Sequence, residues 1–181
     1  MRVIGGQYGG RKITPPTNMP HTRPTTDIAR EGLFNILENN LEIEGMKSLD
    51  LFGGTGSISY ELASRGATDI TIVEKDFRMH AFITKTAGDL GLEEFQVLRV
   101  DVFAFLKRCE SRFNFIFAGP PYALVNIDDL PKLVLEKKLL LPGGWFVLEH
   151  TPRNNYEGYP WFVSKRNYGT TVFSIFVNKE G

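Results

Sequence analysis

A carboxylate followed by a cluster of glycines stands near the end of the first third of the sequence. Asp50 lies in an apolar segment, and three glycines follow it before a helical pattern begins at Ser57. A strand, a glycine turn and a helix in succession predict a corner where a ligand can approach bare backbone. The residues that we expect to form this cradle are Asp50, Phe52, Gly53, Gly54, Thr55 and Gly56.

The residues around this corner argue against a phosphate ligand. The lysine of a phosphate-binding loop is absent, and Ser59 stands where a dinucleotide-binding fingerprint has its third glycine or alanine. Asp50 would repel a phosphate group, whereas it suits a ligand that carries an ammonium and a sulfonium group. S-adenosylmethionine carries both groups, so it is the cofactor that we predict.

Two more acidic residues, Glu74 and Asp101, follow apolar segments that are typical of strands. The carboxyl ends of parallel strands meet at one edge of a sheet, so we expect both acids to lie close to Asp50. Glu74 comes twenty residues after Gly54, a spacing at which a carboxylate accepts the ribose hydroxyl groups of a nucleoside cofactor. Asp101 can accept a hydrogen bond from the adenine amine, cap the next helix, or do both. The neighbouring residues assigned to the same site are Lys75 and Val102.

A proline pair follows a fourth apolar segment. The two prolines fix φ and remove backbone donors, which leaves carbonyl oxygens at the same edge of the sheet with an aromatic ring behind them. Carbonyl acceptors beside an aromatic ring suit a flat base that carries an exocyclic amine. The residues that we predict to act on the substrate are Gly119, Pro120, Pro121 and Tyr122.

The elements that must position these residues alternate between strand and helix. Helices are predicted over residues 27–41, 57–65, 77–90, 103–108 and 127–139, and strands over 49–52, 70–73, 95–100, 113–118, 145–148, 161–165 and 171–177. This alternation predicts a Rossmann-like α/β fold, in which a mostly parallel seven-stranded sheet lies between helices in three αβα layers. We interpret Pro142-Gly143-Gly144 as the turn before the fifth strand. The short connection at Tyr168-Gly169 predicts that the sheet ends in an antiparallel C-terminal hairpin.

Composition limits the class of protein. The 181 residues fit one domain of ordinary size, and 21 basic side chains balance 21 acidic ones. The single cysteine, Cys109, excludes an internal disulfide and a cysteine-based metal site. No apolar run approaches a membrane span, and the N-terminus is too polar for a signal peptide. We therefore expect a cytoplasmic protein, monomeric, with no metal ion and no membrane partner.

The first 26 residues differ from the rest of the chain. Their cations are Arg2, Arg11, Lys12 and Arg23, and they contain no acidic residue. Glycines and prolines between these cations favour an extended arm or a short hairpin. Such a segment can bind a polyanion, or it can be a tail that covers the domain. We therefore divide the chain into a basic N-terminal extension, residues 1–26, and a domain formed by residues 27–181.

Taken together, these motifs resemble the class I S-adenosylmethionine-dependent amino-methyltransferases. The residues that carry this resemblance are Asp50-Leu51-Phe52, Gly54-Thr55-Gly56, Val73-Glu74-Lys75, Asp101 and Pro120-Pro121-Tyr122. A second block is similar to the RsmD-like bacterial 16S rRNA guanine-N2 methyltransferases, namely Arg2 to Gly6, Gly10-Arg11, Thr22 to Asp27 and Arg30-Glu31. The resemblance implies methylation of the N2 amine of a guanine in 16S rRNA or the small ribosomal subunit. It also implies that the N-terminal cations and Arg30 bind RNA.

One residue departs from the family's pattern. That pattern has Asp, or in relatives Asn, before the two prolines, where this chain has Gly119. The resemblance implies that the missing side chain holds the substrate amine. A one-base change, a natural loss and a replacement acceptor elsewhere are all compatible with this glycine.

Two other functions follow from the same motifs. An adenine-N6 nucleic-acid methyltransferase shares the Pro-Pro-Tyr arrangement, but we expect it to carry a target-recognition domain for which 181 residues leave no room. A catalytically impaired RNA-binding homologue would retain the cofactor site and explain Gly119.

Overall fold

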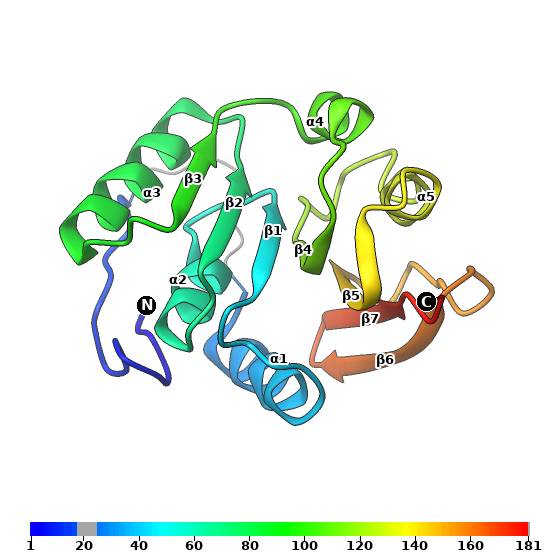
Figure 1. Cartoon of the computed structure of the whole chain (residues 1–181), viewed down its shortest axis with the longest axis horizontal. Helices are drawn as coiled ribbons and strands as arrows, with labels where there is room; N and C mark the ends of the chain where they lie inside the picture. The colour runs from blue at the N-terminus through cyan, green and yellow to red at the C-terminus, as the bar shows by residue number, and fades with distance from the viewer. Residues whose placement is uncertain (18–24, 181) are drawn as a thin grey trace.

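A seven-stranded sheet runs through the middle of the molecule (Figure 1). The structure is a computed structural model that describes residues 1–17 and 25–180. The strands are β1 (Lys47–Leu51), β2 (Asp69–Val73), β3 (Phe95–Leu98), β4 (Phe113–Ala118), β5 (Leu140–His150), β6 (Phe162–Tyr168) and β7 (Thr171–Val177). Their order is β3-β2-β1-β4-β5-β7-β6, and all neighbours are parallel except that β7 is antiparallel to both β5 and β6. The predicted α/β fold with a C-terminal hairpin is therefore confirmed.

Helices cover both faces of this sheet. One face packs against α1 (Asp27–Asn40), α2 (Ser57–Ser64) and α3 (Phe77–Leu90), and the other packs against α4 (Val102–Arg108) and α5 (Asp129–Glu136). Alternation along a strand supplies both cores, because Phe115 and Phe117 of β4 face the first helix layer while Ile116 and Ala118 face the second. The three layers are visible in Figure 1, with α1 at the bottom and α4 and α5 at the upper right.

The predicted turn at residues 142–144 is wrong, because these residues lie inside β5. The pairing of β4 with β5 jumps from Phe113↔Leu140 to Phe115↔Trp145, so the proline and two glycines form a bulge in the strand. Gly143 has a φ of 77°, and a Cβ atom on Gly144 would lie 2.8 Å from the carbonyl oxygen of Leu141. Proline and glycine therefore mark an irregular strand here.

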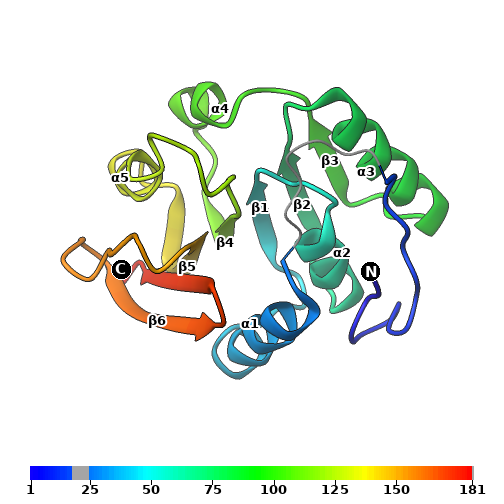
Figure 2. The ribbon, with the colours of Figure 1, turned by 180° about the vertical axis from the view of Figure 1, so that it is seen from behind.

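The N-terminal segment folds back on itself as a short hairpin. The Val3 amide donates to the Arg11 carbonyl at 2.9 Å, and Arg2 pairs with Lys12 in an antiparallel bridge. Val3 and Ile13 are buried in the core beside α2. Figure 2 shows this segment lying alongside the domain near α2. The short hairpin is one of the two forms predicted from composition.

A buried charge network fixes this hairpin to α2. The backbone amides of Ile4 and Gly5 donate to the carboxylate of Glu61 at 2.8 and 2.9 Å. Arg65 pairs with the same carboxylate at 2.9 Å, and Arg30 approaches it at 3.9 Å. Fully buried charges persist only when they are paired and hydrogen-bonded. Glu61 therefore links the N-terminal hairpin to the domain.

Arg30 requires a correction. Its side chain is 1% exposed, and it donates to the carbonyl oxygen of Arg2 and to Asp27. Burial lowers the pKa of Arg30, and the carboxylates of Asp27 and Glu61 partly offset that effect. The sequence placed Arg30 among the RNA-binding cations, whereas the structure gives it a role inside the fold.

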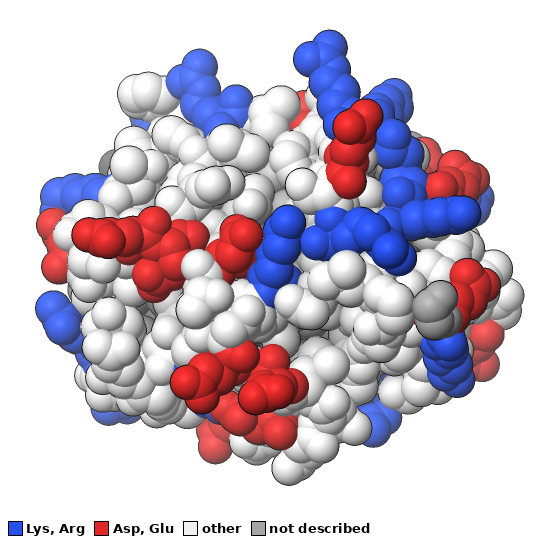
Figure 3. All heavy atoms as spheres, viewed as in Figure 1, with Lys and Arg blue, Asp and Glu red and all other residues white. Residues whose placement is uncertain are grey.

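Charges on the surface are segregated although the net charge is zero. On the face seen in Figure 3, basic side chains gather at the top and right, over α4 and α5, and acidic ones gather at the left and bottom. Lys107, Arg108, Lys137 and Lys138 are exposed on or directly after these two helices. A neutral chain can therefore still present basic surface to a polyanion.

Candidate active site

A cavity of about 410 Å³ opens at the carboxyl ends of the parallel strands. The carboxyl ends of β1, β2, β4 and β5 and the residues that follow β1, β2 and β4 line it, together with the start of α4. Every predicted cofactor and catalytic residue lies on its wall except Gly56. The volume is in the range of small-molecule sites, and the position is the edge where parallel α/β sheets bind ligands.

The glycine corner forms one wall of this cavity. A Cβ atom on Gly53 would lie 2.4 Å from a methyl carbon of Ile72, so only glycine fits there. Gly56 has a φ of 85° and is the N-cap of α2, one residue before the helix begins. Phe52 has a φ of 61°, an uncommon conformation for a residue with a side chain. Strained backbone of this kind gathers at ligand sites.

Asp50 is a buried carboxylate in the floor of the cavity. Its side chain is 2% exposed and accepts a hydrogen bond from Ser59 at 2.7 Å. Burial raises the pKa of Asp50 to about 7, the Ser59 hydrogen bond opposes the rise, and the charge of Glu74 adds to it. Within residues 1–17 and 25–180, no lysine or arginine forms a salt bridge with Asp50. A bound cation would therefore stabilise its charged form.

Sequence reasoning missed the role of Ser59. It noted this residue only as a departure from the dinucleotide fingerprint, whereas the hydroxyl group is buried and holds Asp50. The available signal was its place on the first turn of the helix that follows the glycine corner.

Glu74 joins the tips of two strands. One carboxylate oxygen accepts from the Gly54 amide at 2.9 Å, and the other accepts from the Asp76 amide at 2.8 Å. These bonds fix the carboxylate at the cavity wall. Asp76 caps α3 by accepting from two amides of its first turn, and Asp76 and Met79 line the cavity although the sequence did not indicate them.

Asp101 follows β3, the strand next to β2, where it lines the cavity and is exposed. Its carboxylate accepts from the Ala104 amide at 3.1 Å, which is the helix cap that the sequence offered as one alternative. Contact with an adenine amine remains a prediction.

Three side chains meet at the other end of the cavity. The hydroxyl group of Tyr122 donates to Glu149 at 3.0 Å, and the hydroxyl group of Thr25 donates to the second oxygen of Glu149 at 2.6 Å. Glu149 is 4% exposed. The carbonyl of Pro121 accepts from the Leu124 amide at 3.0 Å, so a local turn already uses one of the two proline carbonyls.

Three of the predicted RNA-binding cations lie on the N-terminal hairpin and not in the cavity wall. Arg2, Arg11 and Lys12 are exposed on the N-terminal hairpin, and Arg23 lies outside the described residues. The hairpin begins beside the glycine corner, because the Thr55 hydroxyl lies 3.8 Å from the Met1 sulfur. These three cations therefore lie on an element that starts at the cavity.

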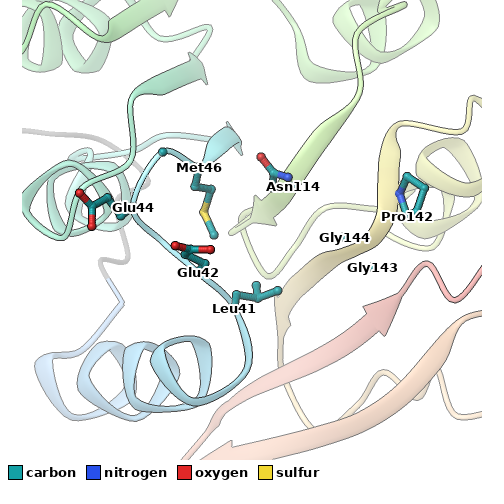
Figure 4. A pocket seen from close by; sticks show the side chains of 9 residues that line it. Leu41, Glu42, Glu44, Met46, Asn114, Pro142, Gly143 and Gly144 are labelled. Atoms are coloured by element: carbon teal, nitrogen blue, oxygen red, sulfur yellow. The ribbon is translucent and has the colours of Figure 1, made fainter. Parts of the chain in front are cut away.

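A second cavity, of about 300 Å³, lies at the other end of the strands (Figure 4). It is bounded by the segment before β1, by Asn114 in β4 and by the bulge of β5. Ligands bind to parallel sheets at the carboxyl edge, so we assign the active site to the first cavity.

The described part of the chain contains neither a candidate metal site nor a candidate membrane-spanning helix. Residues 1–17 and 25–180 hold no cluster of three or more His, Cys, Asp or Glu side chains that could bind a metal ion. None of their helices has the length and apolar character that a bilayer span requires.

Comparisons with known proteins agree with this geometry. The family described as Conserved hypothetical protein 95 matches residues 1–177. A Bacillus subtilis relative, YlbH, is 35% identical over 97% of this chain and 98% of its own length. Ribosomal RNA small subunit methyltransferase D of Escherichia coli K12 is 35% identical over 88% of this chain and 79% of its own. The structure of yhhF from Escherichia coli superposes with a TM-score of 0.87 at 26% identity and covers 99% of this chain and 98% of that one.

Proposed function

This chain belongs to the Conserved hypothetical protein 95 family, the RsmD-like family that its motifs resemble, and we propose that it methylates small-subunit ribosomal RNA. The reaction transfers a methyl group from S-adenosylmethionine to the exocyclic N2 amine of a guanine. The observation that carries this proposal is the convergence of Asp50, Glu74, Asp101 and the Gly119–Tyr122 segment on one cavity.

The cofactor side of the cavity suits S-adenosylmethionine, which supplies an activated methyl group on its sulfonium. Asp50 provides a buried negative charge for the ammonium and sulfonium groups. Glu74, held by the amides of Gly54 and Asp76, is oriented to accept the ribose hydroxyls. Phe52, Gly53 and Gly54 offer backbone, and Thr55, Lys75 and Val102 complete the wall beside Asp101.

The base side of the cavity must hold a flat ring with its amine toward the methyl group. Tyr122 offers a stacking surface, and its hydroxyl bond to Glu149 fixes the ring. Because the Pro121 carbonyl serves a local turn, we assign the carbonyl of Pro120 as the acceptor for the amine. Positioning and exclusion of water are the main contributions of the protein to this reaction.

RNA binding is proposed for the N-terminal extension, residues 1–26, in front of the methyltransferase domain of residues 27–181. Its exposed cations can neutralise phosphates while the target base leaves its stack. A sulfonium donor needs no metal to react, so we expect metal-free catalysis. We also expect a monomer that acts in the cytoplasm on 16S rRNA or the assembled small subunit.

Methyl incorporation tests the function. Small ribosomal subunits that lack the modification are incubated with S-adenosylmethionine labelled in its methyl group, and the labelled nucleoside is identified. Label in N2-methylguanosine supports the proposal, and label in N6-methyladenosine supports the adenine-specific alternative. Binding of both cofactor and RNA without incorporation would support the impaired homologue.

A further inference from the structure

An exposed aromatic side chain lies beside the cavity, on the first residue of α3. Phe77 is 67% exposed, although phenylalanine is among the residue types that are most often buried. The two residues before it, Lys75 and Asp76, line the cavity, whereas Phe77 does not. The ring therefore lies at the rim of the cavity, outside the space that we assign to the cofactor.

A guanidinium group lies over this ring. The Cζ atom of Arg99 is 5.4 Å from the centroid of the Phe77 ring, which is within the range of a cation–π contact. The parallel register explains this contact, because Val73 pairs with Leu98 and the chain continues from these two residues toward Phe77 and Arg99. Figure 1 shows α3 lying next to β3, the strand at the edge of the sheet. The aromatic ring and the guanidinium group therefore form one exposed surface at this edge.

The charge of Arg99 is not neutralised by a direct ion pair. Within residues 1–17 and 25–180 no carboxylate forms a salt bridge with Arg99, although Asp101 is only two positions away. Lys75 adds a second exposed cation, which reaches the cavity wall. The surface around Phe77 therefore combines an exposed ring with positive charge that can attract an anionic ligand.

An aromatic ring beside cations is the combination that binds unpaired RNA nucleotides. Bases stack on aromatic rings and on the planes of Arg guanidinium groups, and nearby cations attract the phosphates. A guanine that leaves its stack to enter the cavity brings the neighbouring nucleotides to the rim of the cavity. Phe77 and Arg99 lie at that rim, so their chemistry and their position both suit such a nucleotide.

We propose, on the premise of the function above, that Phe77 and Arg99 form a stacking site for an unpaired base of the RNA substrate, close to the target guanine. The base stacks on this pair, and Arg99 and Lys75 attract the phosphates beside it. The N-terminal hairpin offers cations for phosphates, whereas this site also holds a base. Phe77 is then a positioning residue, because it holds the RNA over the cavity and does not touch the reacting atoms.

Binding to small ribosomal subunits that lack the modification, measured at several salt concentrations, tests this site. Phe77→Leu keeps an apolar side chain but removes the ring, so the affinity should fall about five- to thirtyfold without a change in the salt slope. Phe77→Trp keeps a stacking ring and should bind like the parent. Arg99→Ala should weaken binding and flatten the slope by nearly one unit. Arg99→Lys should keep the slope but not the full affinity, because an ammonium group has no plane on which a base can stack.

Lys85→Ala is the matched control on the same helix. Lys85 is an exposed cation of α3 that pairs with Asp89 at 3.2 Å, so its removal should change the affinity for small subunits less than about twofold. Calorimetric binding of S-adenosylmethionine within about threefold of the parent shows that each variant is folded and that its cofactor site is intact. Arg99→Lys leaves the ring in place, so it tests the inference even if Phe77→Leu loses cofactor binding.

Parent-like affinity in Phe77→Leu would refute the stacking site, even if Arg99→Ala flattens the slope, because a phosphate contact needs no ring. Equal losses in Phe77→Leu and Phe77→Trp would also refute it, since only one of these variants lacks a stacking surface. Either result in a parent that methylates small subunits leaves the proposed function intact. A parent that neither binds nor methylates small subunits would remove both.

Discussion

Glu61 in α2 and Asp50 in β1 are both acidic and both buried, at 0% and 2% exposure, but their surroundings differ. Glu61 faces Arg30, Arg65 and two backbone amides of the N-terminal hairpin. Asp50 accepts from one hydroxyl group, and no salt bridge to it occurs within residues 1–17 and 25–180. A buried acid surrounded by partners stabilises the fold, whereas one that lacks a cation is arranged for a charged ligand.

The electrostatic surroundings of Glu61 and Asp50 explain why the first stabilises the fold and the second suits a ligand. At Glu61 the attraction of two guanidinium groups and the amide bonds offset the cost of removing the charge from water. At Asp50 that cost is largely uncompensated, so the pKa rises to about 7. The second arrangement weakens the empty protein but favours a ligand that brings its own positive charge. We expect neutralisation of the two acids to have opposite effects on stability.

The largest effect is predicted for Glu61→Gln. Neutralising Glu61 leaves the buried charge of Arg30 with less compensation, so the free energy of unfolding should fall by about 3–5 kcal/mol. Urea denaturation measures this change. Glu38→Gln is the matched control, because Glu38 pairs with Arg65 at 3.3 Å but is about half exposed and should cost less than about 1 kcal/mol. Equal losses in the two variants would show that Glu61 has no special structural role.

Asp50→Asn should raise the free energy of unfolding above neutral pH, which is opposite to the effect of Glu61→Gln. The folded pKa of Asp50 lies above its unfolded value, so its contribution to stability is present below about pH 4 and is lost as the pH rises to about 7. Above that pH the asparagine variant should be more stable than the parent by on the order of 2–4 kcal/mol. Urea denaturation at several pH values tests this, and a parent-like pH profile in the variant would contradict it.

The same variant should respond differently to the cofactor. The parent should bind S-adenosylmethionine more tightly as the pH rises through about 7, because the Asp50 carboxylate becomes charged. Asp50→Asn should bind weakly and without this pH dependence. Calorimetry at the same pH values measures it, and tight binding by the variant would remove Asp50 from the cofactor site.

The features that could be predicted from sequence are local. Apolar runs ending at Asp50, Glu74 and Asp101 predicted three strand tips at one edge, and the glycine corner predicted the helix that follows. These patterns depend on residues within one strand-turn-helix unit. The parallel order then brings the tips together.

The features that sequence reasoning missed depend on contacts between distant residues. Glu149 receives its hydrogen bonds from Thr25, which is 124 positions away, and from Tyr122, which is 27 positions away. Helical spacing places Arg30 on the same face of α1 as Leu33, Phe34 and Leu37, but its partners come from the N-terminal hairpin and from Glu61 in α2 as well as from Asp27. No local pattern identifies the distant partners.

Smaller effects are expected for the exposed cations of the hairpin. Arg2→Ala, Arg11→Ala and Lys12→Ala should each weaken RNA binding by about 1 kcal/mol at 0.1 M salt and flatten the salt dependence by nearly one unit. Unfolding free energies should stay within about 0.5 kcal/mol of the parent, in contrast to Glu61→Gln. RNA titrations at several salt concentrations measure the slope. An unchanged slope in all three variants would refute the proposed RNA contact.

An effect of similar size is expected at Asp101, where an exposed carboxylate caps α4 and is proposed to meet the adenine amine. Asp101→Ser keeps a capping oxygen, whereas Asp101→Ala removes both functions. If the carboxylate accepts from the amine, both variants should lose about 0.5–1.5 kcal/mol of S-adenosylmethionine affinity, and only the alanine variant should also lose about 1 kcal/mol of stability. Calorimetry and urea denaturation on the same samples separate the two. Parent-like affinity in Asp101→Ser would show that Asp101 only caps α4. Its role would then be structural, like that of Glu61.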